Sequence, residues 1–199
     1  MAMKTRGLER VDQLYEDREQ RARELKSGGR RVLGHVCYFV PPEIITAAGL
    51  LPYRITGNFR EQVTQGDAHV ESIMCPYMRN LFDQALKGAG AFLDGVVMGH
   101  ACDSVFRIYG AWTHHAKPPY FRMVNTPHSL SESSREFFRN ELCFFAESLE
   151  KHFNTSITQS KLVAAIDLYN DNRRLVRELY EMRKQPTPPL TGSEMLRVL

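Results

Sequence analysis

The sequence predicts an α/β protein built around a doubly wound parallel sheet of about four strands, with flanking helices and a long C-terminal helix. Short apolar runs rich in β-branched and aromatic residues alternate along the chain with segments of helical periodicity. Parallel strands need helical crossovers between them, so this alternation favours a parallel sheet. A hydrophobic fraction of 43% and a charged fraction of 25% in 199 residues are typical of a globular protein with a substantial core.

Four apolar runs are predicted to be the strands, and they span residues 31–40, 50–57, 92–100 and 119–125. Residues 41–43 (Pro-Pro-Glu) suit a first helical turn, because proline leaves no N–H unpaired there and glutamate favours the positive end of the helix dipole. Residues 58–72 are polar and irregular. Two further helices are predicted to open at Cys75 and at Cys102, each just after a segment that is not helical.

The chain divides into three segments. Residues 1–30 are predicted to hold a surface helix, and residues 31–156 form the α/β domain, whose last helix ends at Phe153. Residues 157–199 are predicted to hold a long helix over 158–184 and a proline-rich break. We expect their last residues to start a connection to a second domain, which the family resemblance described below implies.

The small basic excess, a net charge of +3, lies in the first 31 residues, where one helix over 7–26 is expected to be solvated rather than to bind nucleic acid. No apolar run approaches the roughly 20 residues that span a bilayer, and the start lacks a signal-peptide core. We therefore expect a cytoplasmic protein without a membrane partner. Its cysteines are then reduced, and they are Cys37, Cys75, Cys102 and Cys143.

In a doubly wound sheet, binding sites lie beyond the carboxyl ends of the strands. The loops at 37–43, 99–104 and 125–131 fall there, and the segment that opens with Cys75 can join them from the side. The sequence has no nucleotide-binding, hydrolase or zinc motif such as GxGxxG, GxSxG, HExxH or CxxC. Any chemistry must therefore come from other residues.

Cys75 and Cys102 are each placed at a predicted helix start, where the helix dipole favours a thiolate. Thiolates are the ligands that iron–sulfur centres require. From the residues alone the alternative is that both cysteines are small buried hydrophobic residues.

Several segments of the chain form recognisable motifs. They are the run 34–54 with its EIITAAGLLPYR signature, Cys75-Pro76-Tyr77-Met78-Arg79, Asp94–Val97 with His100 and Cys102-Asp103-Ser104, Arg107-Ile108-Tyr109, Pro127-His128, and Leu190–Glu194. These motifs resemble those of the 2-hydroxyacyl-CoA dehydratase/benzoyl-CoA reductase family. They are spread from about residue 30 to the end of the chain.

The resemblance implies a Rossmann-like fold, pairing with a related subunit, and a [4Fe-4S] cluster held by three cysteines, of which Cys75 and Cys102 are the first two. It implies an ATP-hydrolysing activator that delivers single electrons. The substrate is then an acyl-CoA thioester, either a 2-hydroxyacyl-CoA dehydrated through a ketyl radical or an aromatic acyl-CoA whose ring is reduced. In the family the third cysteine lies in a second domain, so we expect the isolated chain to lack full activity, and the cluster can be absent from it.

Two other functions fit the same sequence. One is that of the related double-cubane-cluster proteins, which are ATP-dependent reductases of small molecules and share the cysteine motifs. The other is a scaffold or subunit-interface domain with no cluster of its own.

Three residues in the loops at the strand ends are candidates for acid–base catalysis, namely Glu43, His100 and His128. Each also has a structural interpretation, because the histidines suit hydrogen-bonded structural roles and Glu43 suits a first helical turn. Cys37 and Tyr38 are predicted to line the substrate pocket, and a third local ligand is the alternative for Cys37.

The remaining candidates are interpreted as structural. Cys143 lies within the apolar pattern of a helix and is predicted to be core. Tyr109 and Trp112, at helical spacing, are also predicted to be core. Arginines 173, 174 and 177 of the long helix can meet CoA phosphates, but a solvated or subunit-facing row of charges is the favoured interpretation.

Overall fold

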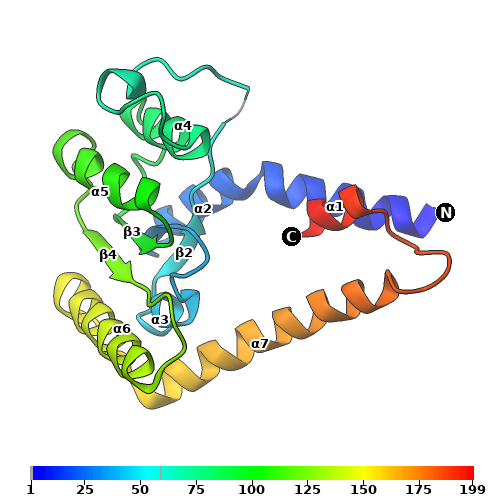
Figure 1. The fold of residues 1–199 in the computed structure, drawn as a ribbon. Coiled ribbons are helices and arrows are strands. Elements are labelled where there is room, and N and C mark those ends of the chain that lie inside the picture. Colours follow the sequence, from blue (N-terminus) through cyan, green and yellow to red (C-terminus); the bar gives the residue numbers. More distant parts are fainter. Residues whose placement is uncertain (1, 59) are drawn as a thin grey trace.

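The computed structural model describes residues 2–58 and 60–199, and it confirms the predicted α/β fold. Its sheet contains β1 (Val32–Val36), β2 (Leu51–Arg54), β3 (Gly95–His100) and β4 (Phe121–Asn125). The strands lie in the order β2-β1-β3-β4, and each neighbouring pair is parallel (Figure 1). The direction in which successive strands are added reverses between β1 and β3. This gap is the topological switch point, where ligands bind in folds of this kind.

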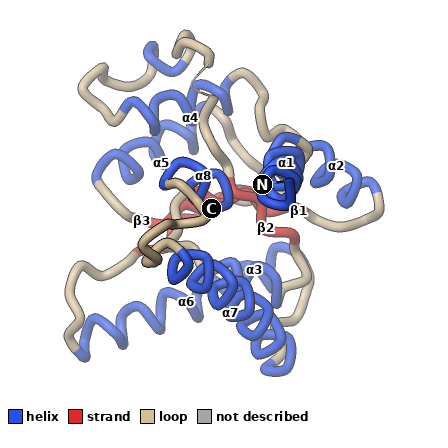
Figure 2. The backbone as a smooth tube through the Cα atoms, turned by 90° about the vertical axis from the view of Figure 1, so that its right-hand side faces the viewer, coloured by secondary structure: helices blue, strands red, loops and turns tan. Residues whose placement is uncertain are grey.

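Helices form a layer on each face of the sheet. The helices are α1 (Ala2–Glu16), α2 (Arg18–Ser27), α3 (Pro42–Ala47), α4 (Pro76–Leu86), α5 (Asp103–His115), α6 (Glu132–Phe153), α7 (Gln159–Met182) and α8 (Gly192–Val198), with a short 3₁₀ turn η1 at Gly66–Ala68. Figure 2 shows the sheet between α4 and α5 on one side and α3, α6 and α7 on the other.

Two apolar clusters fill the space between the layers. One joins the sheet to α2, α4 and α5, with Phe82 and Ile108 fully buried in it. The other joins the sheet to α3 and α6, around Ile45 and Phe145. Strand β1 contributes alternately to both, since Val32 faces the first cluster and Leu33 the second. Trp112 belongs to the first cluster and Tyr109 packs against it, as predicted.

The strands are shorter than the apolar runs that predict them. Strand β1 ends at Val36 because Cys37 adopts a left-handed backbone with φ 69°, which no regular strand continues. Strand β3 begins only at Gly95, and the preceding residue, Asp94, connects this strand to β1 and α2 through its side chain. Its carboxylate accepts the Val32 N–H at 2.7 Å and pairs with Lys26 Nζ at 2.8 Å.

The single helix expected over residues 7–26 is divided into α1 and α2 at Asp17. The side chain of Arg18 takes part in the break. It donates to the carbonyl of Tyr15 at 2.7 Å and to Thr56 Oγ1 at 3.0 Å, which ties the helix junction to the segment after β2. Leu8 and Ala22 are buried positions of these two helices, consistent with a narrow apolar stripe.

The C-terminal part leaves the sheet and returns to the N-terminus. Helix α7 packs against α3, and α8 lies beside α1, where Arg197 pairs with Asp12 (Figure 1). Thr191 opens α8 with a capping box, in which its side chain and that of Glu194 each accept a backbone N–H of the other residue. Among the described residues, no helix is long and apolar enough to cross a membrane.

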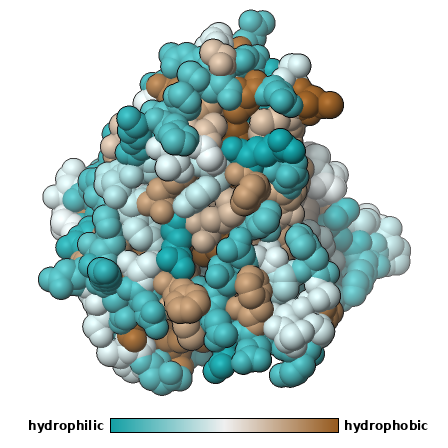
Figure 3. All heavy atoms as spheres, turned by 60° about the vertical axis from the view of Figure 1, so that its left-hand side comes forward, coloured by the Kyte–Doolittle hydropathy of each residue, from teal (hydrophilic) through white to brown (hydrophobic). Residues whose placement is uncertain are grey.

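The prediction that Cys143 is a core residue is wrong, because its side chain is exposed. Helix α6 buries Phe145, Leu149 and Phe153, which follow one another at intervals of four residues. Two residues along a helix correspond to about 200° around its axis, so Cys143 points away from the face that holds Phe145. Figure 3 shows the side of the molecule formed by α4, α5 and α6, where apolar side chains stand among polar ones.

Candidate functional site

Both candidate ligand cysteines are the residues that cap their helices. Cys75 is the N-cap of α4, followed by Pro76 in the first turn, and Cys102 is the N-cap of α5. Neither side chain makes a capping hydrogen bond, and both are exposed free thiols. The predicted positions at helix starts are therefore confirmed. The interpretation of both as buried hydrophobic residues is excluded by their exposure.

The switch point brings a third cysteine close to these two. Cys37 follows β1 and Cys102 follows β3, and the two strands are neighbours in the sheet. The chain after β1 runs directly against the end of β3, where a Cβ added to Gly99 would lie 3.0 Å from Phe39 Cβ. A side chain at this position would press against Phe39, so glycine suits the close approach.

Cys37 is half-buried, and its electrostatic surroundings include both other thiols. Burial raises the pKa of the Cys37 thiol, and the nearby Cys102 and Cys75 raise it further, while the Arg54 guanidinium lowers it. Cys37 also holds a left-handed backbone that is uncommon for residues other than glycine. The His35 ring reinforces that turn, because His35 Nδ1 lies 3.3 Å from the Cys37 carbonyl oxygen.

The cysteines of this site supply some, but not all, of the ligands that an iron–sulfur cluster needs. Cys75 and Cys102 offer soft sulfur ligands that are exposed and not joined in a disulfide, as such a cluster requires. Within residues 2–58 and 60–199, however, no group of three or more His, Cys, Asp or Glu side chains is arranged to hold a metal ion. The chain thus presents two fitting ligands, with Cys37 near them.

His100 and His128 lie together at the ends of β3 and β4. Their rings are 6.4 Å apart, edge to face, and His100 stacks on Phe106 at 5.3 Å. The His100 carbonyl accepts the Thr126 hydroxyl at 2.6 Å, which joins the two strand ends. His128 is exposed. The structure therefore brings two of the predicted acid–base residues into one cluster.

A second layer of polar residues orients the His100 ring. Glu141 of α6 accepts both the backbone N–H of Asn125 at 3.0 Å and its side-chain NH₂ at 3.1 Å. The Asn125 amide oxygen is thereby turned toward His100 Nδ1, at 3.3 Å. A carbonyl oxygen only accepts, so Nδ1 carries the proton and Nε2 is left as the free acceptor.

Glu43 and Tyr38 lie in different environments. The Glu43 side chain is 12% exposed and pairs with Arg173 of α7, so it links α3 to α7. Arg174 pairs with Glu178 and Asp171 of its own helix. Tyr38 is 77% exposed at the strand end, with its ring 4.5 Å from that of Phe39.

The sequence alone assigns no role to Asn125, Glu141 or Arg54. Asn125 and Glu141 are 16 residues apart, and no local pattern connects them before the fold is known. Arg54 stands in the sequence only as part of a signature, although its register partner across the sheet is His35, beside the cysteine turn.

A cavity of about 930 Å³ lies elsewhere, between the α1–α2 junction and the C-terminal halves of α4 and α5. It contains none of the predicted site residues.

Comparisons with known proteins agree on one group of enzymes. The family model described as 2-hydroxyglutaryl-CoA dehydratase, D-component, matches residues 37–199. The chain is similar to a benzoyl-CoA reductase subunit of Thauera aromatica, with 32% identity over 88% of the chain and 47% of that protein. It is similar to the beta subunit of (R)-2-hydroxyglutaryl-CoA dehydratase of Acidaminococcus fermentans, with 22% identity over 87% of the chain and 46% of that protein. It is also 23% identical to the (R)-phenyllactyl-CoA dehydratase beta subunit of Clostridium sporogenes, over 78% of the chain and 42% of that protein. The chain spans about half the length of these curated relatives.

Proposed function

The chain belongs to the 2-hydroxyglutaryl-CoA dehydratase D-component family, and we propose from this membership that it forms part of a subunit of an enzyme acting on acyl-CoA thioesters. The reaction is either dehydration of a 2-hydroxyacyl-CoA or reduction of an aromatic acyl-CoA. The proposed partners are a related subunit and an ATP-hydrolysing protein that supplies single electrons.

The observation that carries the proposal is the placement of Cys75 and Cys102. Both are free, exposed thiols at helix starts, Cys102 follows the strand beside the one that Cys37 follows, and both thiols act electrostatically on Cys37. This is the place where a doubly wound sheet binds ligands. Thiols used only for packing would be buried, and a structural zinc site would show closely spaced pairs of cysteines.

We propose that Cys75 and Cys102 are two ligands of a [4Fe-4S] cluster. The remaining protein ligand is proposed to come from a residue that is not part of this chain. Such a cluster supplies single electrons at low potential and an iron that acts as a Lewis acid toward a substrate oxygen. Cys37 and Tyr38 are proposed to line the substrate side of the site.

Acid–base work is proposed for His100, with His128 beside it. The Asn125 contact leaves His100 Nε2 free to accept a proton from substrate or to return one. Glu43 is proposed as a further acid–base residue of the substrate site. It lies in the first turn of α3, where Arg173 pairs with its carboxylate.

The test is turnover by the protein purified anaerobically with a related partner subunit and an ATP-hydrolysing activator. Both 2-hydroxyacyl-CoA and aromatic acyl-CoA substrates are supplied. We expect one class to react, and Cys75→Ser and Cys102→Ser each to abolish the reaction. Cys143→Ser is the matched control, because this thiol is exposed but lies on α6, and it should retain activity. Activity that survives the loss of either Cys75 or Cys102 would contradict the proposal.

A further inference from the structure

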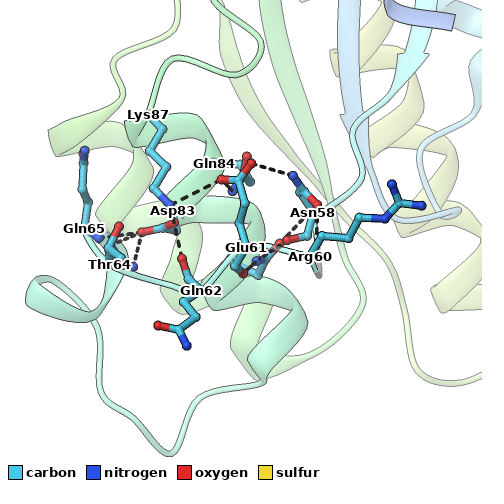
Figure 4. Close-up of polar contacts among 11 residues, drawn as sticks. Asn58, Arg60, Glu61, Gln62, Thr64, Gln65, Asp83, Gln84 and Lys87 are labelled. Carbon is cyan, nitrogen blue, oxygen red and sulfur yellow. Dashed lines mark hydrogen bonds and ion pairs between the residues drawn. The ribbon is translucent and has the colours of Figure 1, made fainter. Parts of the chain in front are cut away.

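Helix α4 carries a line of functional groups on its polar side. Cys75, Arg79, Asp83 and Lys87 follow one another at intervals of four residues, so they lie along one side of the helix. The last three all contact the lead-in segment, a name that we use for residues 58 and 60–74, which end directly before Cys75. Figure 4 shows the side chains of α4 and of the lead-in segment turned toward one another.

Asp83 is the centre of these contacts. Its side chain is fully buried, and Oδ1 accepts the backbone N–H groups of Thr64, Gln65 and Gly66 at 2.8, 2.6 and 2.9 Å. Its other oxygen pairs with Lys87 Nζ at 2.7 Å. Three successive amides on one carboxylate fix the backbone of the lead-in segment at this point, as an anion fixes the loop that binds it.

Arg79 holds the part of the lead-in segment nearest to Cys75. Its guanidinium donates to Asp67 Oδ1 at 2.9 and 2.6 Å and to the carbonyl of Ser72 at 3.1 Å. Ser72 is only three residues before Cys75. Arg79 therefore connects the first turn of α4 to the chain that leads into it.

Asn80 anchors the beginning of the segment. Its side chain accepts the Asn58 N–H at 2.7 Å and donates to the Asn58 carbonyl at 3.0 Å. Asn80 is itself buried, and Gly57 packs against it so closely that an added Cβ would lie 2.5 Å from its amide oxygen. The lead-in segment is thus attached to α4 at both ends and in the middle.

We propose that Arg79 and Asp83 are positioning residues for the Cys75 thiol. A segment of this length with almost no regular structure has many conformations available, and loops of that kind are ordered only when something holds them. Without these contacts the lead-in segment and the first turn of α4 loosen together, and Cys75 loses its fixed place beside Cys37 and Cys102. The proposal rests on the proposed function only for what Cys75 binds.

The test attaches a nitroxide spin label to Cys75 in the 199-residue chain, with the other cysteines changed to serine. The mobility of the label is read from its electron paramagnetic resonance line shape. We expect Asp83→Asn and Arg79→Gln each to shift the spectrum toward a more mobile label. Arg174→Gln is the control, because it removes exposed ion pairs with Glu178 and Asp171 within α7, away from the lead-in segment, and its spectrum should match the parent.

A second label position separates local from global effects. The same label on Cys102, in a background where Cys75 is serine, should keep its line shape when Asp83→Asn is introduced. An unchanged Cys75 spectrum in Arg79→Gln, whose helices are intact by circular dichroism, would overturn the proposal. So would equal loosening at Cys75 and Cys102. Neither outcome depends on a bound cluster, so each is distinguishable from failure of the proposed function.

Discussion

Asp83 is an ionised carboxylate in a site with no access to water, and its partners explain why it stays ionised. Burial alone would raise the pKa of Asp83, but the Lys87 ammonium and the N–H groups of Gly66, Thr64 and Gln65 outweigh burial and lower the pKa to about 2. A lowered pKa means that the folded state binds the proton more weakly than the unfolded state does. The ionised form therefore stabilises the fold.

The first prediction concerns the pH at which this stabilisation disappears. It is fully present above the unfolded-state pKa of about 4, and it is lost as pH falls through the folded-state value of about 2. Denaturant unfolding between pH 7 and pH 2 should show the parent protein losing more stability in this window than Asp83→Asn. At pH 7, Asp83→Asn should itself cost about 1–3 kcal/mol, since an amide oxygen accepts the three N–H groups more weakly. Parallel curves for the two proteins would contradict this account.

His100 and Asn125 illustrate what residue-level prediction from sequence can and cannot reach. His100 is a candidate from sequence because it follows a strand at the carboxyl end of the sheet, and it does lie at the site. The orientation of its ring depends on Asn125 and, through Asn125, on Glu141 of a helix that follows later in the chain. Such an arrangement has no local signature, because the residues meet only when α6 packs on β4.

At the scale of elements, close contacts at glycine decide where β3 can lie. A Cβ added to Gly95 would come within 2.6 Å of Tyr120 Cβ and 2.9 Å of the Tyr120 carbonyl oxygen. The backbone atom cannot move aside without separating β3 from β4, since Tyr120 O also accepts the Val96 N–H at 2.8 Å. Gly110, in the middle of α5, has open space around its Cα instead.

The second prediction compares these two glycines. Gly95→Ala should destabilise the protein by about 1–3 kcal/mol, because the added methyl group meets backbone. Gly110→Ala should stabilise it by roughly 0.5–1 kcal/mol, because alanine loses less backbone entropy than glycine on entering a helix. Thermal and denaturant unfolding of the two variants provide the measurement. Similar changes in stability for the two variants would show that the contact between β3 and β4 does not exclude a side chain at position 95.

The elements that sequence predicts best are those with strong local signals. The proline after Cys75 predicts that a helix opens there, and the apolar pattern ends a helix at Phe153, and both positions agree with the structure. The core prediction for Cys143 fails because it treats a mixed apolar pattern as one continuous face, whereas α6 buries a narrower stripe. The break at Asp17 has no local signal, because the side chain that completes it, Arg18, is bound by Thr56 of a distant segment.

At the scale of the whole molecule, the long helix α7 is fixed to the sheet domain through α3. Glu43 and Arg173 provide the ion pair across this contact, and Thr46 Oγ1 lies 3.2 Å from the Tyr169 hydroxyl. The Glu43 carboxylate is largely buried, whereas the Arg174 pairs lie within α7 on its exposed surface. Exposed pairs of this kind contribute little, and buried ones are costly to break.

The third prediction uses Arg173 and Arg174 as a matched pair of neighbours. Arg173→Gln should cost about 1–2 kcal/mol, because it leaves a largely buried carboxylate without its partner. Arg174→Gln should cost less than about 0.5 kcal/mol. Equilibrium unfolding of both variants decides the point. Equal costs would mean that the contact between α3 and α7 does not depend on this ion pair.

The fold class is predictable from the sequence, but the spatial order of the strands and the packing of the helices are not. Local periodicity shows that helices alternate with strands along the chain. A helix between two strands provides the crossover that parallel pairing requires, so parallel pairing is predictable. The strand order β2-β1-β3-β4 does not follow from that periodicity, and neither does the packing of α8 on α1. Yet this strand order is what places the ends of β1 and β3 side by side, and with them Cys37 and Cys102.

The central claim is that Cys75 and Cys102 are ligands of an iron–sulfur cluster. The most direct measurement is iron and sulfide content with Mössbauer spectroscopy, on protein purified anaerobically with its related partner subunit. We predict the signal of a [4Fe-4S] cluster assigned to this chain, lost in both Cys75→Ser and Cys102→Ser and retained in Cys143→Ser. A cluster that persists without either thiol, or a folded parent complex in which this chain carries no iron, would contradict the claim.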